Sequence, residues 1–366
     1  MKQRKKGRGE RERGEQRGMR RSKPLRSCLF VGLVRSSGGS RSFSSVSAPS
    51  LLSSIEHIST EYDALLLDQF GVLHDGKEAL PGARECYERL AAQRKKMAVL
   101  SNTSRRRAFA ISKLPQLGFD PRALTAFICS GEQAWNHMVE QRSGQSALWI
   151  SWAEDFQAWD PAYLDGTNVK LAPASEADFL LCHGSMALRD GKGVVLTHML
   201  RSGILPPALE EQLRVGVERN LPMVCANPDL HVVLPDGSRG HMPGLIAQRY
   251  LELGGQLIEF GKPHTAAFEA ALAELGPDIK RERVLHIGDS LEHDIAGANA
   301  AGIHSLFVCG GVHAEELRQI REQLGEDTDA EGRRDGDAMP VSQAQLNELF
   351  RRYGVQPTHS TPMLRW

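Results

Sequence analysis

From residue 64 onward, short apolar runs that end in polar residues alternate with stretches of helical periodicity. The run Ala64–Leu67 ends at Asp68, and the run Met97–Leu100 ends at Ser101. Continuous apolar runs of this length are typical of strands that are buried on both faces of a sheet. Between them, residues 83–91 carry apolar side chains at helical spacing. The order strand, helix, strand predicts a right-handed crossover unit and therefore a parallel sheet.

The same pattern returns near the other end of the chain. Residues 268–275 form an apolar helical stripe, and the run Val284–Gly288 predicts a strand that ends at Asp289. A helix is expected over 292–301 and a further strand over 305–309. Together, the two blocks predict an α/β fold with a Rossmann-like parallel sheet.

Residues 110–245 separate the two blocks and contain strand-like runs of their own, near 147–150, 179–182 and 223–226. A stretch of this length is sufficient for an inserted domain. The predicted organisation is a leader at 1–50, a core at 51–115 and 246–312, a cap domain at 116–245, and a C-terminal extension at 313–366 with a mobile loop near 323–341.

Charge separates the first 50 residues from the rest. Residues 1–50 hold 14 Lys and Arg and 3 Glu, whereas the remainder holds 31 basic and 42 acidic residues. The segment is rich in Arg and Ser, and it has no acid from Met19 to Ile55. This composition predicts a transit peptide for the mitochondrion or, alternatively, the chloroplast. The three Glu precede Met19, which makes Met19 an alternative start; the alternative to targeting is a disordered basic tail on a cytoplasmic protein.

Composition excludes several classes of protein. The six cysteines form no C-x-x-C pair, which argues for a reducing compartment and against a disulfide-built secreted domain. The longest apolar run, Cys28–Val34, is far shorter than the roughly 20 residues of a membrane span. Equal numbers of basic and acidic residues, 45 each, argue against a uniformly basic nucleic-acid coat. We therefore expect no membrane and no nucleic-acid partner.

Polar residues follow several of the predicted strands at the points where these end. In an open parallel sheet, such residues converge beyond the carboxyl ends of the strands, where ligands bind. Buried carboxylates need partners, and a divalent cation together with an ammonium group would supply them. The residues in question are Asp68, Ser101 with Asn102, Lys262, and Asp289 with Asp294.

Four segments in order resemble the motifs of the haloacid-dehalogenase superfamily of hydrolases. They are Asp68-Gln69-Phe70-Gly71-Val72-Leu73, Leu100-Ser101-Asn102, Gly261-Lys262-Pro263, and Gly288-Asp289-Ser290 with Asp294. The resemblance covers residues 60–312. The insertion, with Ala226-Asn227-Pro228-Asp229, is similar to the type-two cap of the class IIA branch, which includes nitrophenyl, phosphoglycolate, and sugar or nucleotide phosphatases. The resemblance therefore implies a Rossmann-like core with an inserted α/β cap domain.

The resemblance also implies a Mg²⁺-dependent phosphatase that acts on a small phosphate monoester. Asp68 is implied as the nucleophile that forms an aspartyl-phosphate, which water then cleaves. Mg²⁺ is implied to be held by the Asp68 carboxylate, the Phe70 carbonyl and Asp289, with Asp294 orienting a water on the ion.

The same resemblance implies how the phosphoryl group is held. Ser101, Lys262 and the backbone amides around Asn102 are implied to bind the phosphoryl oxygens as charge spreads over them. A homodimer formed through the cap is compatible with this branch, whereas the substrate is set by cap loops that the sequence does not interpret.

Phe70 departs from the pattern, because the superfamily's phosphatases usually carry a second acid at this position. That acid protonates the leaving oxygen and later activates water, and positioned acid–base catalysis contributes roughly 10²–10⁴-fold. One hypothesis is a phosphatase that works without the acid, slowly or on a good leaving group, or with His74 or Asp75 as a substitute. A second is a catalytically weak or inactive protein that keeps the site to bind phosphate and metal. A dehalogenase-like hydrolase is disfavoured, because carbon–halogen displacement needs no Mg²⁺, yet Asp289 and Asp294 are both present.

Overall fold

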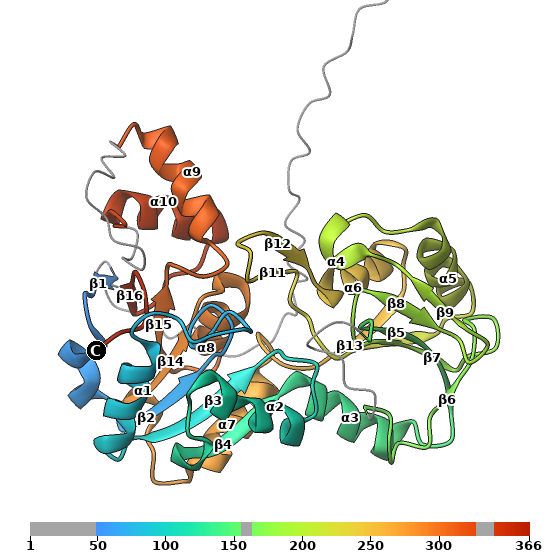
Figure 1. Ribbon diagram of the computed structural model, residues 1–366, viewed down its shortest axis with the longest axis horizontal. Helices are drawn as coiled ribbons and strands as arrows, with labels where there is room; N and C mark the ends of the chain where they lie inside the picture. Colours follow the sequence, from blue (N-terminus) through green and yellow to red (C-terminus); the bar gives the residue numbers. More distant parts are fainter. Residues whose placement is uncertain (1–48, 155–162, 327–339) are drawn as a thin grey trace, which may run out of the picture. The chain divides into compact units, whose positions relative to one another are not determined.

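The computed structural model describes residues 49–154, 163–326 and 340–366 (Figure 1). A first sheet has seven strands, and every neighbouring pair in it is parallel. This confirms the prediction of an α/β fold with a parallel sheet. The strands, in their order across the sheet, are β1 (Ser50–Leu51), β16 (His359–Thr361), β15 (His304–Val308), β14 (Val284–Gly288), β2 (Ala64–Leu67), β3 (Lys96–Ser101) and β4 (Leu124–Cys129).

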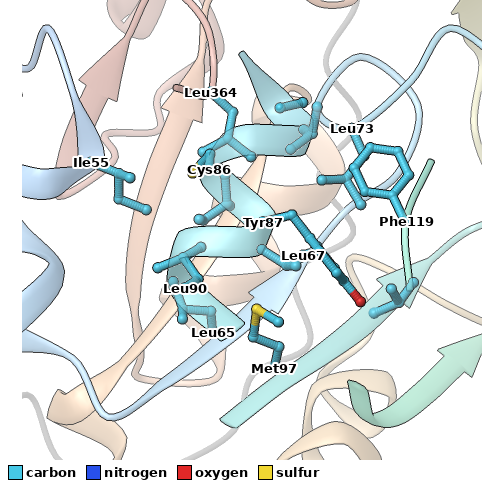
Figure 2. Close-up of a cluster of buried hydrophobic side chains, with 14 of the residues drawn as sticks. Ile55, Leu65, Leu67, Leu73, Cys86, Tyr87, Leu90, Met97, Phe119 and Leu364 are labelled. Carbon is cyan, nitrogen blue, oxygen red and sulfur yellow. The ribbon is translucent and has the colours of Figure 1, made fainter. Parts of the chain in front are cut away.

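Side chains of the central strands alternate between the two faces of the first sheet. On one face, Leu65 and Leu67 of β2 belong to a buried cluster with Tyr87 and Leu90 of α1 (Ala83–Ala92) (Figure 2). Helix α1 presents an apolar stripe to the sheet because its apolar side chains recur at helical spacing. The alternation fixes the register of β2, since a shift by one residue would turn both leucines to the opposite face.

The opposite face of the first sheet is also covered. There, Ala64 and Leu66 of β2 cluster with Phe268 of α7 (Thr265–Leu275) and with α8 (Ala296–Ala300). Burial on both faces explains why these strands are almost continuously apolar in sequence. Every apolar side chain of β2 is therefore used in packing, and the polar residue that follows is left at the sheet's carboxyl edge.

A second sheet contains six strands in one path and a seventh beside it. Most of its pairs are parallel, whereas β8 is antiparallel to β5 and to β9. Helix α3 (Ser130–Gln141) packs on one face, and α5 (Pro207–Glu218) and α6 (Pro243–Glu252) pack on the other. The path is β13 (Gln256–Glu259), β10 (Pro222–Cys225), β7 (Phe179–Cys182), β5 (Ser146–Ser151), β8 (Ala187–Arg189) and β9 (Val194–Leu196), with β6 (Lys170–Leu171) paired to β5.

Two small elements complete the cap. A two-stranded antiparallel hairpin is formed by β11 (His231–Val233) and β12 (Arg239–His241). A single turn of helix, α4 (Met199–Ser202), lies nearby, and its Leu200 shares a buried cluster with Met242. The hairpin follows directly after the turn at Asn227-Pro228-Asp229, so it is placed close to the carboxyl ends of the core strands.

The boundaries between core and cap differ from those expected at 115/116 and 245/246. Strand β4 pairs with β3 in the first sheet, and β13 pairs with β10 in the second. The chain therefore passes from one sheet to the other after Cys129 and returns after Glu259. Strand β4 is an edge strand with partly exposed side chains, and its apolar run Ala126–Cys129 was not assigned to the core in the sequence.

The C-terminal segment 313–366 is not a separate extension. Strand β16 pairs with β15, and β1 pairs with β16, so the segment supplies the strand next to the edge strand β1 of the first sheet. Helices α9 (Ala314–Leu324) and α10 (Gln343–Tyr353) cluster with Phe307 of β15. Strand β16 reads His-Ser-Thr, and a strand without apolar residues gives no hydrophobic pattern in sequence. Most of the loop expected near 323–341 lies outside the described residues, as does almost all of the leader 1–50.

Two further features differ from or add to the expected elements. The helix expected over 292–301 begins as a π-helical turn, Leu291–Ile295, before α8, and a short helix, α2 (Arg107–Lys113), follows β3. Within the part of the chain that the structure describes, no helix is long and apolar enough to cross a membrane.

Candidate active site

The polar residues that follow the core strands meet at the carboxyl edge of the first sheet. Asp68 follows β2, Ser101 is the last residue of β3, and Asp289 follows β14. Lys262 lies in the loop between β13 and α7, and Asp294 in the π-helical turn after β14. All five side chains are buried. The structure thus brings together the residues that the sequence selected.

Lys262 is the centre of this cluster, and its side chain is only 2% exposed. Its Nζ lies 2.8 Å from Oδ1 of Asp68 and 2.6 Å from Oδ1 of Asp294. Although burial opposes the charged form, the carboxylates of Asp294 and Asp68 raise the pKa of Lys262 above its ordinary value. The ammonium therefore stays charged and holds the two carboxylates in place.

Asp294 is saturated with donors. Besides Lys262, the Nε2 of His286 lies 2.7 Å from its Oδ1, and the backbone N–H of Ser290 donates to its Oδ2 at 3.0 Å. Burial opposes its ionisation, but Lys262 and His286 lower the pKa of Asp294 below its usual range. With both oxygens occupied, Asp294 is placed to support the site from behind.

His286 was missed by sequence reasoning, although it left a signal. It interrupts the apolar run of β14, where a buried histidine needs polar partners at both ring nitrogens. Its Nδ1 lies 3.1 Å from the carbonyl oxygen of Leu66. The ring thus links β2 to Asp294 and aligns the two strands that carry Asp68 and Asp289.

Asp289 is enclosed by backbone. The N–H of Val312 donates to its Oδ2 at 2.8 Å. A Cβ added at Gly71 or at Gly311 would come within 2.0 Å of the same oxygen, and Gly71 also has a positive φ of 76°. Only glycine fits at these two positions without moving the carboxylate. The segment 311–312 is another part of the site that the sequence did not indicate.

The cluster carries more negative than positive charge. Ligand atoms of Asp68, Asp289 and Asp294 all lie within 4.8 Å of one another. Burial raises the pKa of Asp68 to about 7, and burial together with the neighbouring Asp68 and Asp294 raises the pKa of Asp289 well above its ordinary value. Oxygen ligands from carboxylates are what Mg²⁺ binds in proteins. The donor set therefore fits a hard divalent cation, which would remove the repulsion.

Asn102 acts as a clamp between three segments. Its Oδ1 accepts the N–H of Lys262 at 2.7 Å, and its Nδ2 donates to the carbonyl oxygen of Lys262 at 2.9 Å and to Oδ1 of Asp229 at 2.8 Å. Its side chain is thus engaged in holding the lysine loop and the cap turn. Ser101 differs, because its Oγ accepts the N–H of Thr103 at 3.2 Å and keeps a hydroxyl hydrogen to donate.

Phe70 follows Asp68 by two residues and is fixed by its surroundings. Its ring makes an edge-to-face contact with His74, with ring centroids 4.7 Å apart at 77°. A Cβ added at Gly76 would come within 2.7 Å of the Phe70 ring. The ring therefore occupies a fitted position, and the side chain two residues after Asp68 offers no proton.

Two cavities open onto Asp68, and Phe70, Asp229, Val232 and Val233 line both. The polar cavity, of about 420 Å³, is also lined by Lys262, Asp289 and Asp294. The apolar-walled cavity, of about 380 Å³, contains Ser101, Asn102 and Arg105 together with cap residues. The apolar part of its cap wall is formed by Trp152, Val232, Val233, Leu234, Pro235 and Met242, and the polar cap residues Arg201, Asn227, Asp229 and Asp236 also line the cavity.

Comparison with known proteins agrees with this geometry. Residues 65–159 match a family described as haloacid dehalogenase-like hydrolase, and residues 259–326 match a related HAD-hydrolase-like family. Both matched families are haloacid-dehalogenase-like hydrolases. The two matches cover both halves of the core and leave out residues 160–258, most of the cap. The predicted resemblance to this superfamily, and with it a hydrolase, is confirmed.

Relatives and solved structures of this family show the same architecture. Glycerol-3-phosphate phosphatase of Gallus gallus is 29% identical over 269 residues, which cover 71% of this chain and 84% of the relative. The crystal structure of a haloacid dehalogenase-like hydrolase from Brucella suis is 24% identical, with a TM-score of 0.64. The match covers 86% of this chain and 99% of the chain in that structure. The p-nitrophenyl phosphatase of Archaeoglobus fulgidus is 21% identical, with a TM-score of 0.51. The match covers 73% of this chain and 94% of the phosphatase chain. Neighbours of this type confirm the core with an inserted class IIA cap.

Proposed function

We propose that the protein is a divalent-metal-dependent phosphatase that hydrolyses a small phosphate monoester through an aspartyl-phosphate on Asp68. The observation that carries the proposal is the buried cluster of Asp68, Asp289 and Asp294, joined by Lys262. Such a cluster is costly to bury unless it serves a bound cation and a charged substrate. The phosphatase name of the relative from Gallus gallus supports the same conclusion.

The residues divide the chemistry between them. A carboxylate oxygen of Asp68 attacks phosphorus, the Asp68–phosphorus bond forms, and the bond to the leaving oxygen breaks. Lys262 and the hydroxyl of Ser101 donate hydrogen bonds to the phosphoryl oxygens. Water then adds to phosphorus and releases the carboxylate of Asp68. Asp294 keeps Lys262 aligned throughout, because it binds the same ammonium.

Mg²⁺ is the cofactor that these residues fit. The carboxylates of Asp68 and Asp289 and the carbonyl oxygen of Phe70 would hold it, with Asp294 behind. When bound, it would neutralise charge that develops on the phosphoryl oxygens.

The test is a screen of the purified chain against a panel of phosphate monoesters, with Mg²⁺ and with a chelator. We expect phosphate release that requires the metal, and a rise in melting temperature on addition of Mg²⁺ because the ion binds the folded state. An Asp289→Asn variant should lose both responses, whereas the surface variant Asp190→Asn should keep them. A melting temperature that does not change with Mg²⁺, together with no phosphate release from any ester, would contradict the proposed function.

The variant Phe70→Asp is expected to speed hydrolysis of alkyl phosphates by up to about 10²-fold. The new carboxyl group would lie two residues after the nucleophile and could protonate the leaving oxygen. The gain is limited because His74 and Gly76 fit an aromatic ring, so the carboxyl group is partly desolvated. Hydrolysis of p-nitrophenyl phosphate should change much less, because that leaving group scarcely needs a proton. Phe70→Asn, which has the same shape without the acid, is the control, and an equal rise in both variants would contradict this explanation.

We further propose that residues 1–50 direct the protein to the mitochondrion. The support is the composition of the segment, with 14 basic and 3 acidic residues and many serines. A fluorescent reporter carrying residues 1–50 should enter the organelle, and one carrying residues 19–50 should do so at least as well. Import into chloroplasts would assign the segment to that organelle instead. A diffuse cytosolic signal from both fusions would contradict the proposal that the segment is a targeting signal.

A further inference from the structure

We infer that the substrate is an aryl phosphate, a monoester of an acidic hydroxyl on an apolar ring. The inference rests on the proposed phosphatase function and deepens it. Two independent features support it: the protonation chemistry around Asp68, and the wall of the apolar-walled cavity. Each excludes a different class of phosphate ester.

The apolar-walled cavity is the side on which the organic part of the substrate fits. Ser101 and Asn102, which follow β3, line this cavity and not the polar one. The polar cavity instead contains Lys262, Asp289 and Asp294, and so it is the side of the metal and water. A phosphoryl group on Asp68 between these two sides directs its ester oxygen toward the cap wall.

Among the described residues, the acids that line this cavity besides Asp68 are Asp75, Asp229 and Asp236, and all three accept hydrogen bonds. Oδ1 of Asp75 accepts the N–H groups of Lys77 and Glu78, each at 2.8 Å. Oδ1 of Asp229 accepts Nδ2 of Asn102 at 2.8 Å.

Asp236 is bound more tightly still. Its two oxygens accept from Arg201 and from the backbone and hydroxyl of Ser238. Donors of this kind favour the ionised carboxylate. All three acids are thus hydrogen-bond acceptors in the structure, and Asp236 accepts with both of its oxygens.

His74 does not replace the missing acid either. It is buried, its Nδ1 accepts the N–H of Gly76 at 3.1 Å, and it lines a neighbouring pocket instead of the cavity that contains Asp68. The substitute acids considered from the sequence, His74 and Asp75, are therefore both engaged in the loop's own hydrogen bonds.

The leaving oxygen must then depart with its electron pair as an anion, and take its proton from water afterwards. When the Asp68–phosphorus bond forms and the ester bond breaks, none of the described acids that line the apolar-walled cavity is engaged as a proton donor to the leaving oxygen. A phenol, like the tyrosine side chain, has a pKa near 10. The pKa of an alkyl alcohol is far higher, because an alkyl alcohol resembles water. A site without an acid therefore favours aryl over alkyl esters.

The cavity wall separates aryl phosphates from other esters with good leaving groups. Acyl phosphates and diphosphates also have acidic leaving groups, but these are polar and small or charged. Here Trp152, Met242 and the β11 residues Val232 and Val233 present apolar surface, and Phe70 adds an aromatic ring at the nucleophile. Apolar walls bind a ring by removing its surface from water.

The first experiment measures kcat/KM of the full chain with Mg²⁺ on ring-substituted phenyl phosphates, cyclohexyl phosphate and acetyl phosphate. We expect kcat/KM to fall steeply as the pKa of the leaving group rises within the phenyl series. Cyclohexyl phosphate, which matches phenyl phosphate in size, should react at least about 10²-fold more slowly. Acetyl phosphate should show a KM at least tenfold higher than phenyl phosphate.

The second experiment tests the wall with a matched pair of exposed valines. Val233 is 39% exposed and lines both cavities, whereas Val194 is 50% exposed on β9 and lines neither cavity. Val233→Ser should raise KM for phenyl phosphate severalfold and change KM for acetyl phosphate much less. Val194→Ser should change neither.

The outcomes separate the inference from the function on which it rests. No release from any compound, acetyl phosphate included, would remove the proposed phosphatase itself. Equal rates on cyclohexyl and phenyl phosphate would leave a phosphatase and overturn the aryl inference. A selective loss of alkyl phosphate hydrolysis in His293→Gln, a residue of the polar cavity, would also overturn it, because it would reveal a general acid. Unchanged KM values in Val233→Ser would remove the apolar wall as a determinant.

Discussion

Asp68→Asn is expected to lower phosphate release by roughly 10⁴-fold or more, because loss of a nucleophile removes the covalent step entirely. The asparagine has the same shape, and its Oδ1 can still accept the ammonium of Lys262, which lies 2.8 Å from the native carboxylate. The fold should therefore persist, and circular dichroism and the melting temperature measure this. The kinetic measurement is phosphate release at saturating substrate with Mg²⁺.

A chemical signature accompanies the loss of rate. The native chain, quenched in acid during turnover, should carry phosphate on the peptide that contains Asp68, and the variant should carry none. Asp190→Asn is the matched control, because Asp190 only caps the turn at Lys192 and Gly193. Native rates in Asp68→Asn would refute Asp68 as the nucleophile.

Lys262→Met is expected to lower the free energy of unfolding by about 3–5 kcal/mol and to abolish phosphate release. The methionine fills much of the same space but leaves the carboxylates of Asp68 and Asp294 buried without their cation. Urea denaturation in the absence of metal measures the first effect. Lys192→Met is the control, because the ion pair of Lys192 with Glu176 is exposed and such pairs contribute about 0–1 kcal/mol.

The destabilisation in Lys262→Met should depend on pH. The pKa of Asp68 is already raised by burial from 3.8 to about 7, and removal of Lys262 raises it further. A carboxyl group with a raised pKa in the folded state stabilises the fold most below its unfolded value, and this stabilisation is lost as pH rises through the folded value. The variant should therefore differ more from the native chain at pH 8 than at pH 5. An equal difference at both values would indicate that the cost comes from packing and not from charge.

Much of the core was predictable from local pattern. Leu65 and Leu67 must be buried on one face and Leu66 on the other, so the run that ends at Asp68 could hardly be anything but a central parallel strand. The same pattern at β14 placed Asp289 at the same edge. Strand β16 was missed because its three residues are polar, and strand β4 was not assigned to the core because an apolar run does not reveal which sheet it joins.

The amino-acid sequence by itself determined the parallel sheet, the strand ends and the residue types gathered there, because burial forces a periodicity that survives in one dimension. Only the tertiary structure decided which groups form hydrogen bonds with the polar residues at the strand ends. His286 binds Asp294, and the N–H of Val312 binds Asp289, through contacts between segments distant from Asp68 in sequence. The apolar surface that the cap contributes to the cavity at Asp68 is likewise decided in three dimensions. Hydrogen-bond partners and cavity walls come from whichever segments the fold brings within a few ångströms, and no spacing along the chain encodes that proximity.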